Sequence, residues 1–272
     1  MVFFCLMEPK RQTHRTIEYP RNRFPIIDYL SVARRKPLIH VLLEADVTQA
    51  RAMIRERRMA AGEQLSFTAF LIGCVAKAVD EDKLAHAYRR RRKLVIYDAV
   101  DVCVLVEHQV GDRRLPAPHV IRSANNLTVE QIHREIRRFQ QEGAHESDPW
   151  RLSRIYPYFP GFLRRLFWRV LLGSPSLMKR IPGTVCVTAA GMFGKGAGWG
   201  IPLSGYTLTL TVGGIERKAI MDKDQPATRE MLSLTVSFDH EIVDGAPAAR
   251  FANRLRELIQ AGHGLDELPR SA

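Results

Sequence analysis

The stretch MLSLTVSFDHEIVDGAPAARF, Met231 to Phe251, joins a strand pattern, a histidine and a helix pattern. Apolar and polar residues alternate over 232–238, which predicts a half-buried strand. Apolar residues then recur at helical spacing over 248–259, which predicts an amphipathic helix. His240 therefore follows a strand end, where its backbone is fixed and its side chain can reach into a cleft. Many histidines in such positions have only a structural role, so this spacing alone leaves catalysis open.

Length and composition favour one domain with a substantial core. The chain has 272 residues, 46% of them apolar, and shows no internal repeat and no Pro- or Ser-rich linker, so we expect a single domain over 1–272. No apolar run approaches the roughly 18–20 residues that span a bilayer. The net charge of +12 favours anionic partners such as phosphorylated cofactors. Because no nucleic-acid-binding motif accompanies the charge, we expect no nucleic-acid partner.

The four cysteines, Cys5, Cys74, Cys103 and Cys186, are scattered along the chain. No C-x-x-C pair and no His/Cys cluster has the spacing of zinc ligands, so we expect no metal site. Free thiols are typical of a reducing compartment, and we therefore expect a cytoplasmic protein.

Local patterns predict the remaining elements. We expect an irregular arm over about 1–36, with turns where Pro116 and Pro118 interrupt the chain and at Gly213-Gly214. Thr128 and Gln131 form a capping box that opens a helix. The other expected strands are 38–45, 96–106, 185–188, 207–212 and 215–217, and the other expected helices are 46–61 and one opening at 66–68.

Five consecutive positive charges, RRRRK, occupy 89–93 beside Tyr88. A solvated hairpin explains them most simply. Contact with a CoA phosphate or with an acidic partner protein is the alternative.

The segment 145–180 is unusually basic and apolar. Its central part YPYFPGFLRRLFWRVLLG, 156–173, places three arginines on part of one helical turn, with apolar residues around the rest. Such a basic amphipathic helix can make peripheral contact with an anionic membrane. Packing against its own domain or against a neighbouring subunit is the alternative.

Three blocks resemble one enzyme family. They are GTVCVTAAGMFG (183–194), TVGGIERKAI (211–220) and SFDHEIVDGAPAARF (237–251), the last with the pattern H-x-x-x-D-G. Together they are similar to the catalytic domain of dihydrolipoamide acyltransferases, the acyl-transfer components of 2-oxo acid dehydrogenase complexes. These belong to the chloramphenicol acetyltransferase-like superfamily of CoA-dependent acyltransferases. The resemblance covers about 38–260 and implies an α/β two-layer sandwich, a mixed sheet covered by helices.

The resemblance also implies a set of catalytic residues. His240 would be the general base that takes the proton from the thiol of CoA or of a dihydrolipoyl group. Thr188 stands where the family places a serine that donates a hydrogen bond to the oxyanion. Asp244 would be structural, held by a buried charge pair or by hydrogen bonds. Two residues depart from the family pattern, Glu241 in place of arginine and Ala189 in place of asparagine, and both bear on specificity.

The family assembles as homotrimers or multiples of trimers, with His240 of one subunit facing Thr188 of the next. These 272 residues contain no recognisable lipoyl domain, linker or subunit-binding domain, and 145–180 looks enlarged relative to the family. We therefore expect acyl-CoA as a substrate and a lipoyl group supplied by another protein. Two alternatives remain open: an acyltransferase acting on a small alcohol or amine, and an inactive trimeric scaffold apposed to a membrane through 156–173.

Overall fold

The computed structural model describes residues 14–61, 65–110, 113–142, 155–189, 196–222 and 225–266. The GMFG motif at 191–194 and residues 145–154 of the unusual segment lie outside these ranges. The helices are α1 (Phe24–Ala33), α2 (Thr48–Ala61), α3 (Phe67–Glu81), α4 (Val129–Glu142), α5 (Gly161–Gly173), α6 (Pro175–Arg180) and α7 (Gly245–Gln260), with 3-10 turns at Arg21–Arg23, Lys83–His86, Ala124–Asn126 and Tyr156–Tyr158. The strands are β1 (Leu38–Asp46), β2 (Tyr88–Arg90), β3 (Lys93–Val95), β4 (Val102–Val110), β5 (Arg113–Ile121), β6 (Val185–Ala189), β7 (Leu208–Asp222) and β8 (Gln225–Asp239).

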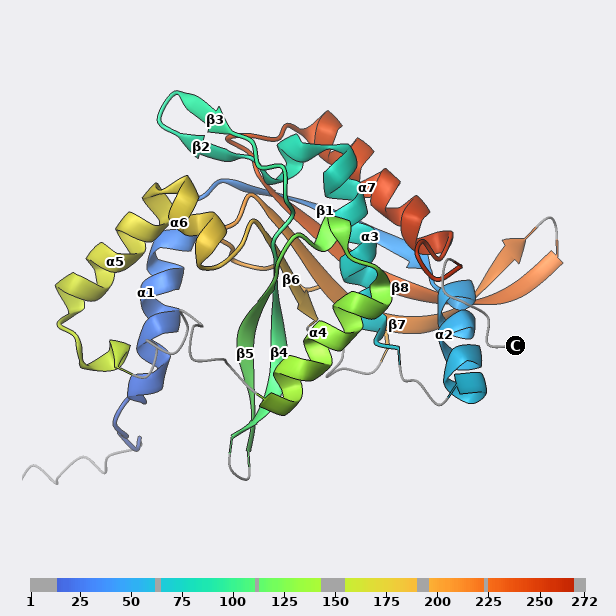
Figure 1. The fold of residues 1–272 in the computed structure, drawn as a ribbon, viewed down its shortest axis with the longest axis horizontal. Helices are drawn as coiled ribbons and strands as arrows, with labels where there is room; N and C mark the ends of the chain where they lie inside the picture. Colours follow the sequence, from blue (N-terminus) through green and yellow to red (C-terminus); the bar gives the residue numbers. More distant parts are fainter. Residues whose placement is uncertain are drawn as a thin grey trace, which may run out of the picture.

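Six strands form one mixed sheet in the order β1-β8-β7-β6-β4-β5, and β2 and β3 form a separate hairpin. The neighbours β4, β6 and β7 run parallel, and the other pairs are antiparallel. Strands β7 and β8 continue past the sheet as a long two-stranded arm (Figure 1).

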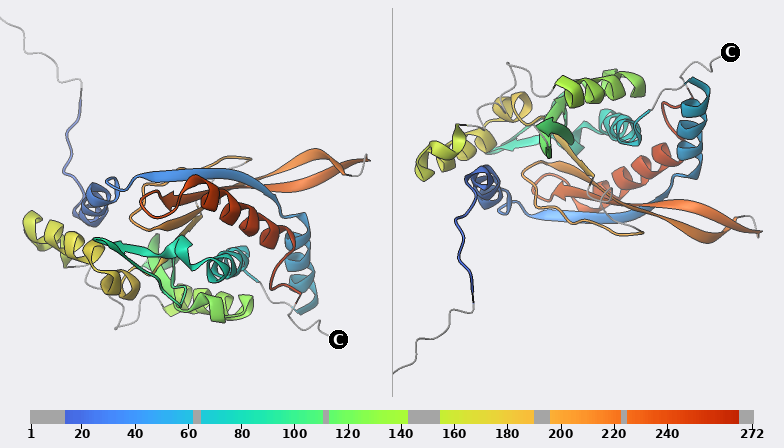
Figure 2. Two further views of the ribbon diagram at one scale, coloured as in Figure 1. Left: turned by 90° about the horizontal axis from the view of Figure 1, so that it is seen from above. Right: turned by 90° about the horizontal axis from the view of Figure 1, so that it is seen from below.

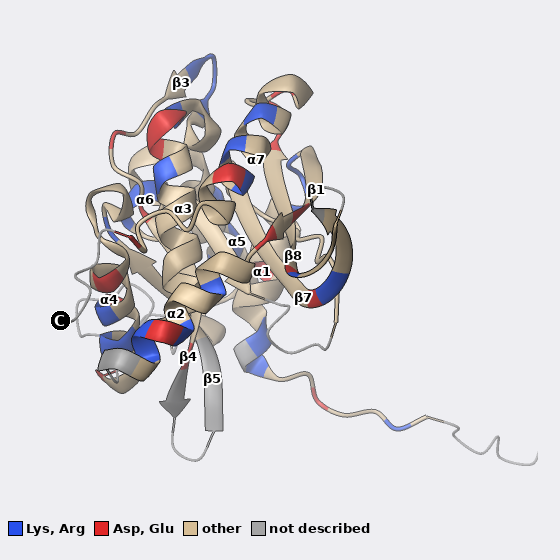
Figure 3. Cartoon of the chain, turned by 90° about the vertical axis from the view of Figure 1, so that its right-hand side faces the viewer, with Lys and Arg blue, Asp and Glu red and all other residues tan. Residues whose placement is uncertain are grey.

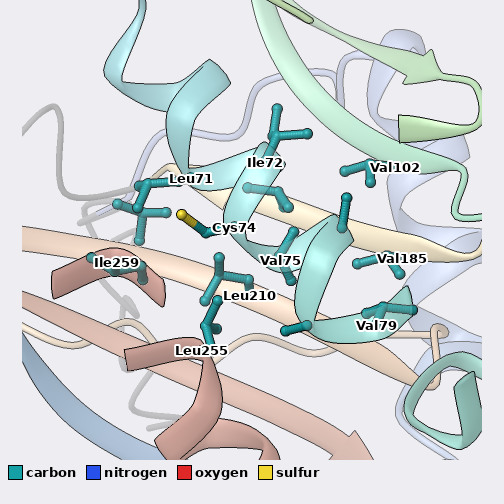
Figure 4. Close-up of a cluster of buried hydrophobic side chains, with 14 of the residues drawn as sticks. Leu71, Ile72, Cys74, Val75, Val79, Val102, Val185, Leu210, Leu255 and Ile259 are labelled. Atoms are coloured by element: carbon teal, nitrogen blue, oxygen red, sulfur yellow. The ribbon is translucent and has the colours of Figure 1, made fainter. Parts of the chain in front are cut away.

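Helices α3, α4 and α7 cover one face of this sheet (Figure 2). The apolar residues Leu232, Leu234, Val236 and Phe238 of β8 point into the core beneath these helices. Figure 4 shows the centre of this core, where α3 packs beside α7 over the sheet. Ser66 caps α3 by accepting a hydrogen bond from the backbone N–H of Ala69, as its sequence signal predicted. The expected α/β two-layer sandwich is therefore confirmed.

The prediction that β8 is half-buried is wrong, because both of its faces are covered. Ser233, Thr235 and Ser237 are at most 1% exposed. The segment 196–207 crosses this second face, where the backbone N–H of Gly198 donates to the Ser233 Oγ over 3.4 Å. A Cβ added at Gly213 would lie 2.0 Å from the Gly198 carbonyl oxygen, so a glycine is needed beneath the crossing segment.

Three predicted irregularities lie inside regular elements. Strand β5 runs through Pro116 and Pro118, and β7 passes Gly213-Gly214 with a register shift instead of a turn. Strand β5 tolerates its prolines because it lies at the sheet edge, where one side needs no donor.

The predicted irregular arm over 1–36 is wrong for 24–33, which form helix α1. Pro25 stands in the first turn of this helix, where a proline costs no hydrogen bond and its fixed φ suits the helix. Helix α1 packs on α5, with the ring centroids of Tyr29 and Trp168 5.2 Å apart. The arm is therefore ordered where it contacts the α5 segment.

Candidate active site

His240 lies at the end of β8 with its backbone fixed and its side chain open. Its N–H donates to the carbonyl of Pro37 over 2.8 Å, and the N–H of the preceding Asp239 donates to the carbonyl of Thr207 over 2.9 Å. These two bonds tie the residue to the start of β1 and to the start of β7. The imidazole side chain is 45% exposed. The backbone is thus held from two sides while the ring remains accessible to a ligand.

Asp244 is the acidic neighbour of this histidine. The His240 Nδ1 and the Asp244 Oδ1 lie 3.5 Å apart, which leaves Nε2 facing away from the carboxylate. The Asp244 side chain is 85% exposed in the single chain. Asp244 is the N-cap residue of α7 at the open rim of the sheet, and its carboxylate is not buried in the single chain. Its expected structural role, through a buried charge pair or hydrogen bonds, stays a prediction. Within the single chain, the Asp244 carboxylate lies beside the His240 imidazole.

A buried ion pair stands directly behind His240, and sequence reasoning missed it. The Lys36 Nζ lies 2.5 Å from the Asp239 Oδ2, and the Asp239 side chain is 2% exposed. The same ammonium group lies 5.3 Å from the centre of the Tyr88 ring. Burial and the negative charge of Asp239 raise the pKa of Tyr88 to about 12. Lys36 thereby joins the segment before β1 to the residue that carries the candidate base.

The run RRRRK forms the tip of the β2–β3 hairpin, and its residues are exposed as predicted (Figure 3). Arg89 is exposed but also forms an ion pair. Its guanidinium pairs with the Glu241 carboxylate, with an Nη2–Oε2 distance of 2.7 Å. Since Glu241 follows the candidate base, the hairpin is attached beside the His240 end of the sheet.

Thr188 does not lie near His240 within one chain. It stands opposite Thr211 across β6 and β7, and Thr211 stands opposite Thr235 across β7 and β8. His240 is five residues beyond Thr235, which places it roughly 17 Å further along the strand direction and about 10 Å across it. The structure therefore brings His240 and Asp244 together and leaves Thr188 apart from both.

Thr188, Thr211 and Thr235 form a row of hydroxyl side chains across three adjacent strands. Thr188 is half-buried, and the other two are at most 2% exposed. Neither the Thr211 Oγ1 nor the Thr235 Oγ1 has a hydrogen-bond partner among the described residues. The predicted strand TLTLTV (207–212) contains Thr211, and no sequence signal linked this residue to Thr188 or Thr235.

A second buried polar cluster links the sheet to α6. The His86 Nδ1 lies 2.9 Å from the Thr184 Oγ1, and its Nε2 lies 3.1 Å from the Tyr97 carbonyl oxygen. The Tyr97 hydroxyl donates to the carbonyl of Pro175 at the start of α6. Burial lowers the pKa of His86 to about 4. This neutral histidine holds structure together and lies in no open site.

The model of the 2-oxoacid dehydrogenases acyltransferase family (catalytic domain) matches residues 11–147 and 176–265. The chain belongs to this family. It is 24% identical over 230 residues to the lipoamide acyltransferase component of the branched-chain alpha-keto acid dehydrogenase complex of Bacillus subtilis, which covers 83% of this chain and 47% of that protein. It is 26% identical over 168 residues to the mitochondrial dihydrolipoyllysine-residue succinyltransferase of Saccharomyces cerevisiae, which covers 62% of this chain and 30% of that protein. The chain thus spans less than half the length of these relatives.

Solved structures show the same fold. A probable dihydrolipoamide acetyltransferase of Listeria monocytogenes superimposes with a TM-score of 0.69 at 22% identity, covering 92% of this chain and 96% of that one. The cubic core of a pyruvate dehydrogenase multienzyme complex gives a TM-score of 0.69 at 18% identity, covering 95% and 98%. Dihydrolipoamide acetyltransferase of Azotobacter vinelandii gives 0.68 at 18% identity, covering 95% and 98%. That structure was determined to investigate one serine, one histidine and one asparagine in its catalytic mechanism.

Among the described residues, no helix is both long and apolar enough to cross a bilayer.

Proposed function

We propose that this domain transfers an acyl group between CoA and a dihydrolipoyl-type thiol, with His240 as the general base. The observation that carries the proposal is the presentation of His240, an accessible imidazole on a fixed strand end beside Asp244. The Azotobacter vinelandii protein supports the assignment. In that protein the serine precedes the histidine by the same number of residues as Thr188 precedes His240 here. Its asparagine follows the histidine by the same number of residues as Asp244 follows His240.

The proposed reaction moves one proton and exchanges one thioester bond. The His240 Nε2, which faces away from Asp244, takes the proton from the attacking thiol. The thiolate sulfur attacks the thioester carbonyl carbon, and the carbonyl oxygen becomes an oxyanion that accepts a hydrogen bond from the Thr188 hydroxyl. The bond between that carbon and the leaving sulfur then breaks, and the leaving thiolate takes the proton from the imidazolium. CoA is either product or substrate, depending on direction.

A second copy of the chain supplies Thr188 in this proposal. Within one chain Thr188 and His240 are too far apart to act on one thioester. A closed ring of three subunits related by rotation places the same two surfaces against each other at every interface. The cubic core formed by one structural relative supports this assembly, because a cube contains threefold axes. We therefore propose a homotrimer, alone or within a larger assembly, and a lipoyl group supplied from outside these residues.

CoA release from a panel of acyl-CoAs, with and without free dihydrolipoamide, tests this function. Release that requires dihydrolipoamide is the expected result, and the preferred acyl chain identifies the substrate. Release that occurs only with small alcohols or amines would replace the proposed acceptor. If no CoA is released with any acceptor, the domain is a non-catalytic scaffold.

A further inference from the structure

We propose that helix α5 docks this domain on the surface of an anionic lipid bilayer. The family match leaves out residues 148–175, which contain α5, so the family core does not account for this helix. The inference is separate from acyl transfer and does not rest on it.

One side of α5 is anchored to the domain. Trp168 and Leu171 are buried, and the indole N–H of Trp168 donates to the Tyr156 hydroxyl over 2.8 Å. The Arg164 guanidinium lies 3.3 Å from the Asp28 carboxylate and stacks over the ring of Phe24. These contacts fix the rotation of the helix about its axis and so determine which residues face outward.

The opposite side carries two adjacent rows of exposed apolar side chains. Residues four apart share a helix face, which places Phe162, Leu166 and Val170 in one row and Leu163 and Phe167 in the next. Their exposed fractions run from 41% to 64%. Exposed apolar residues that adjoin in this way mark an interaction surface, whereas single ones need no explanation. We call these five residues the apolar face of α5.

Two arginines border this face. Arg165 and Arg169 each follow a residue of the first row by three positions and are therefore its neighbours on the helix. Both are exposed, and neither has an acidic partner among the described residues. Residues 155–182 contain no Asp or Glu at all. The segment that carries the apolar face therefore contributes only positive charge beside it.

An anionic bilayer matches this arrangement better than a protein partner. Its acyl region accepts the apolar rows, and its headgroups supply negative charge along the border where arginine side chains reach outward. Helix α5 has 13 residues, so it is about 20 Å long and too short to span a bilayer. It can lie in the interface, with its long axis parallel to the membrane plane. Figure 1 shows α5 at the edge of the molecule, at the end opposite α2, and no helix or strand of the described residues lies on its outer side.

The test is co-sedimentation of the full chain with vesicles of phosphatidylcholine containing about one third phosphatidylglycerol, compared with pure phosphatidylcholine. We expect binding to the anionic vesicles only, and release at about 0.5 M salt. Leu166→Glu and the double variant Arg165→Glu/Arg169→Glu should each weaken binding at least about tenfold. His240→Ala should bind as the unchanged protein does.

Matched controls lie on α2, at the far end of the molecule. Met59 is 88% exposed and Arg58 is exposed, so Met59→Glu places a glutamate on an exposed apolar position elsewhere and Arg58→Glu reverses one exposed charge there, and both should leave vesicle binding intact. Equal losses in the control variants would overturn the proposal, as would absence of binding to anionic vesicles. A third result would also overturn the proposal: the protein does not bind vesicles, but it self-associates without lipid and Leu166→Glu abolishes this association. That result would show that a second copy of the chain covers the apolar face.

Discussion

The His240 end of β8 and the apolar face of α5 are both exposed, but they are built in different ways. His240 has its backbone held by strands β1 and β7 and by the buried Lys36–Asp239 pair behind it. Only its ring is free. Helix α5 is attached along one side through Trp168 and Arg164, and a whole helix face is left open.

This difference separates a position suited to chemistry from a surface suited to docking. A general base must be held at hydrogen-bond distance from its substrate, with a positional error of no more than about 0.5 Å, and this requires a fixed backbone. A membrane contact depends on buried apolar area and on charge, and it tolerates a loosely oriented partner. The family match divides the chain in the same way, since it includes His240 and leaves out α5.

The largest expected effect is on catalysis alone. His240→Ala should lower kcat about a thousandfold, because the reacting thiol loses its proton acceptor. Thermal unfolding should change little, since the imidazole is half exposed. Steady-state CoA release and a melting curve measure both quantities. Turnover near that of the unchanged protein would show that His240 is not the general base. The His240 end of β8 would then no longer differ from α5 as a position suited to chemistry.

Lys36 tests whether the fixed backbone matters to the site. Lys36→Met leaves the buried Asp239 carboxylate without its cation and should cost about 3 kcal/mol of stability. Because Lys36 acts on the base through Asp239 and the fixed backbone, kcat/KM should fall about tenfold with the shape of the pH–rate profile kept. Lys36→Arg should recover most of both losses. A purely structural role would lower stability while leaving kcat/KM per folded molecule unchanged.

The His86 cluster joins the sheet to the α5–α6 unit, and it predicts a pH dependence of stability. Above pH 6.5 this imidazole is neutral in both the folded and the unfolded chain, so its contribution is complete. As pH falls from 6.5 to about 4, the imidazole becomes protonated in the unfolded chain but stays neutral in the folded chain. The free energy of unfolding therefore falls by on the order of 2 kcal/mol. Urea unfolding across this range measures the slope. His86→Gln should flatten it relative to the unchanged protein, and equal slopes would contradict the buried neutral state.

Local patterns in the sequence were enough to predict many of the elements. The capping box of Thr128 and Gln131 opens α4 as expected, with both hydrogen bonds formed. The alternation over 232–238 and the helical spacing after it lie in β8 and α7. These features depend on residues a few positions apart, and their periodicity is visible in any single chain.

Features that depend on distant partners could not be predicted in this way. Lys36 and Asp239 are 203 positions apart, and no pattern links them. The crossing of segment 196–207 over β8 turned a predicted solvent face into a buried one, and the edge position of β5 allowed prolines inside a strand. The exposure of Asp244 likewise follows from where the sheet ends. Such facts come from tertiary packing, which overrides local signals.

The central claim is that His240 and Thr188 act together only across a subunit boundary. Co-expression of His240→Ala and Thr188→Val chains in equal amounts, with different tags to isolate mixed assemblies, tests it most directly. Each variant alone should be about a hundredfold or more below the unchanged protein. In each mixed trimer one interface of the three joins an intact His240 to an intact Thr188, so about a third of full activity should return. Mixed assemblies no more active than the separate variants would show that no such shared site exists.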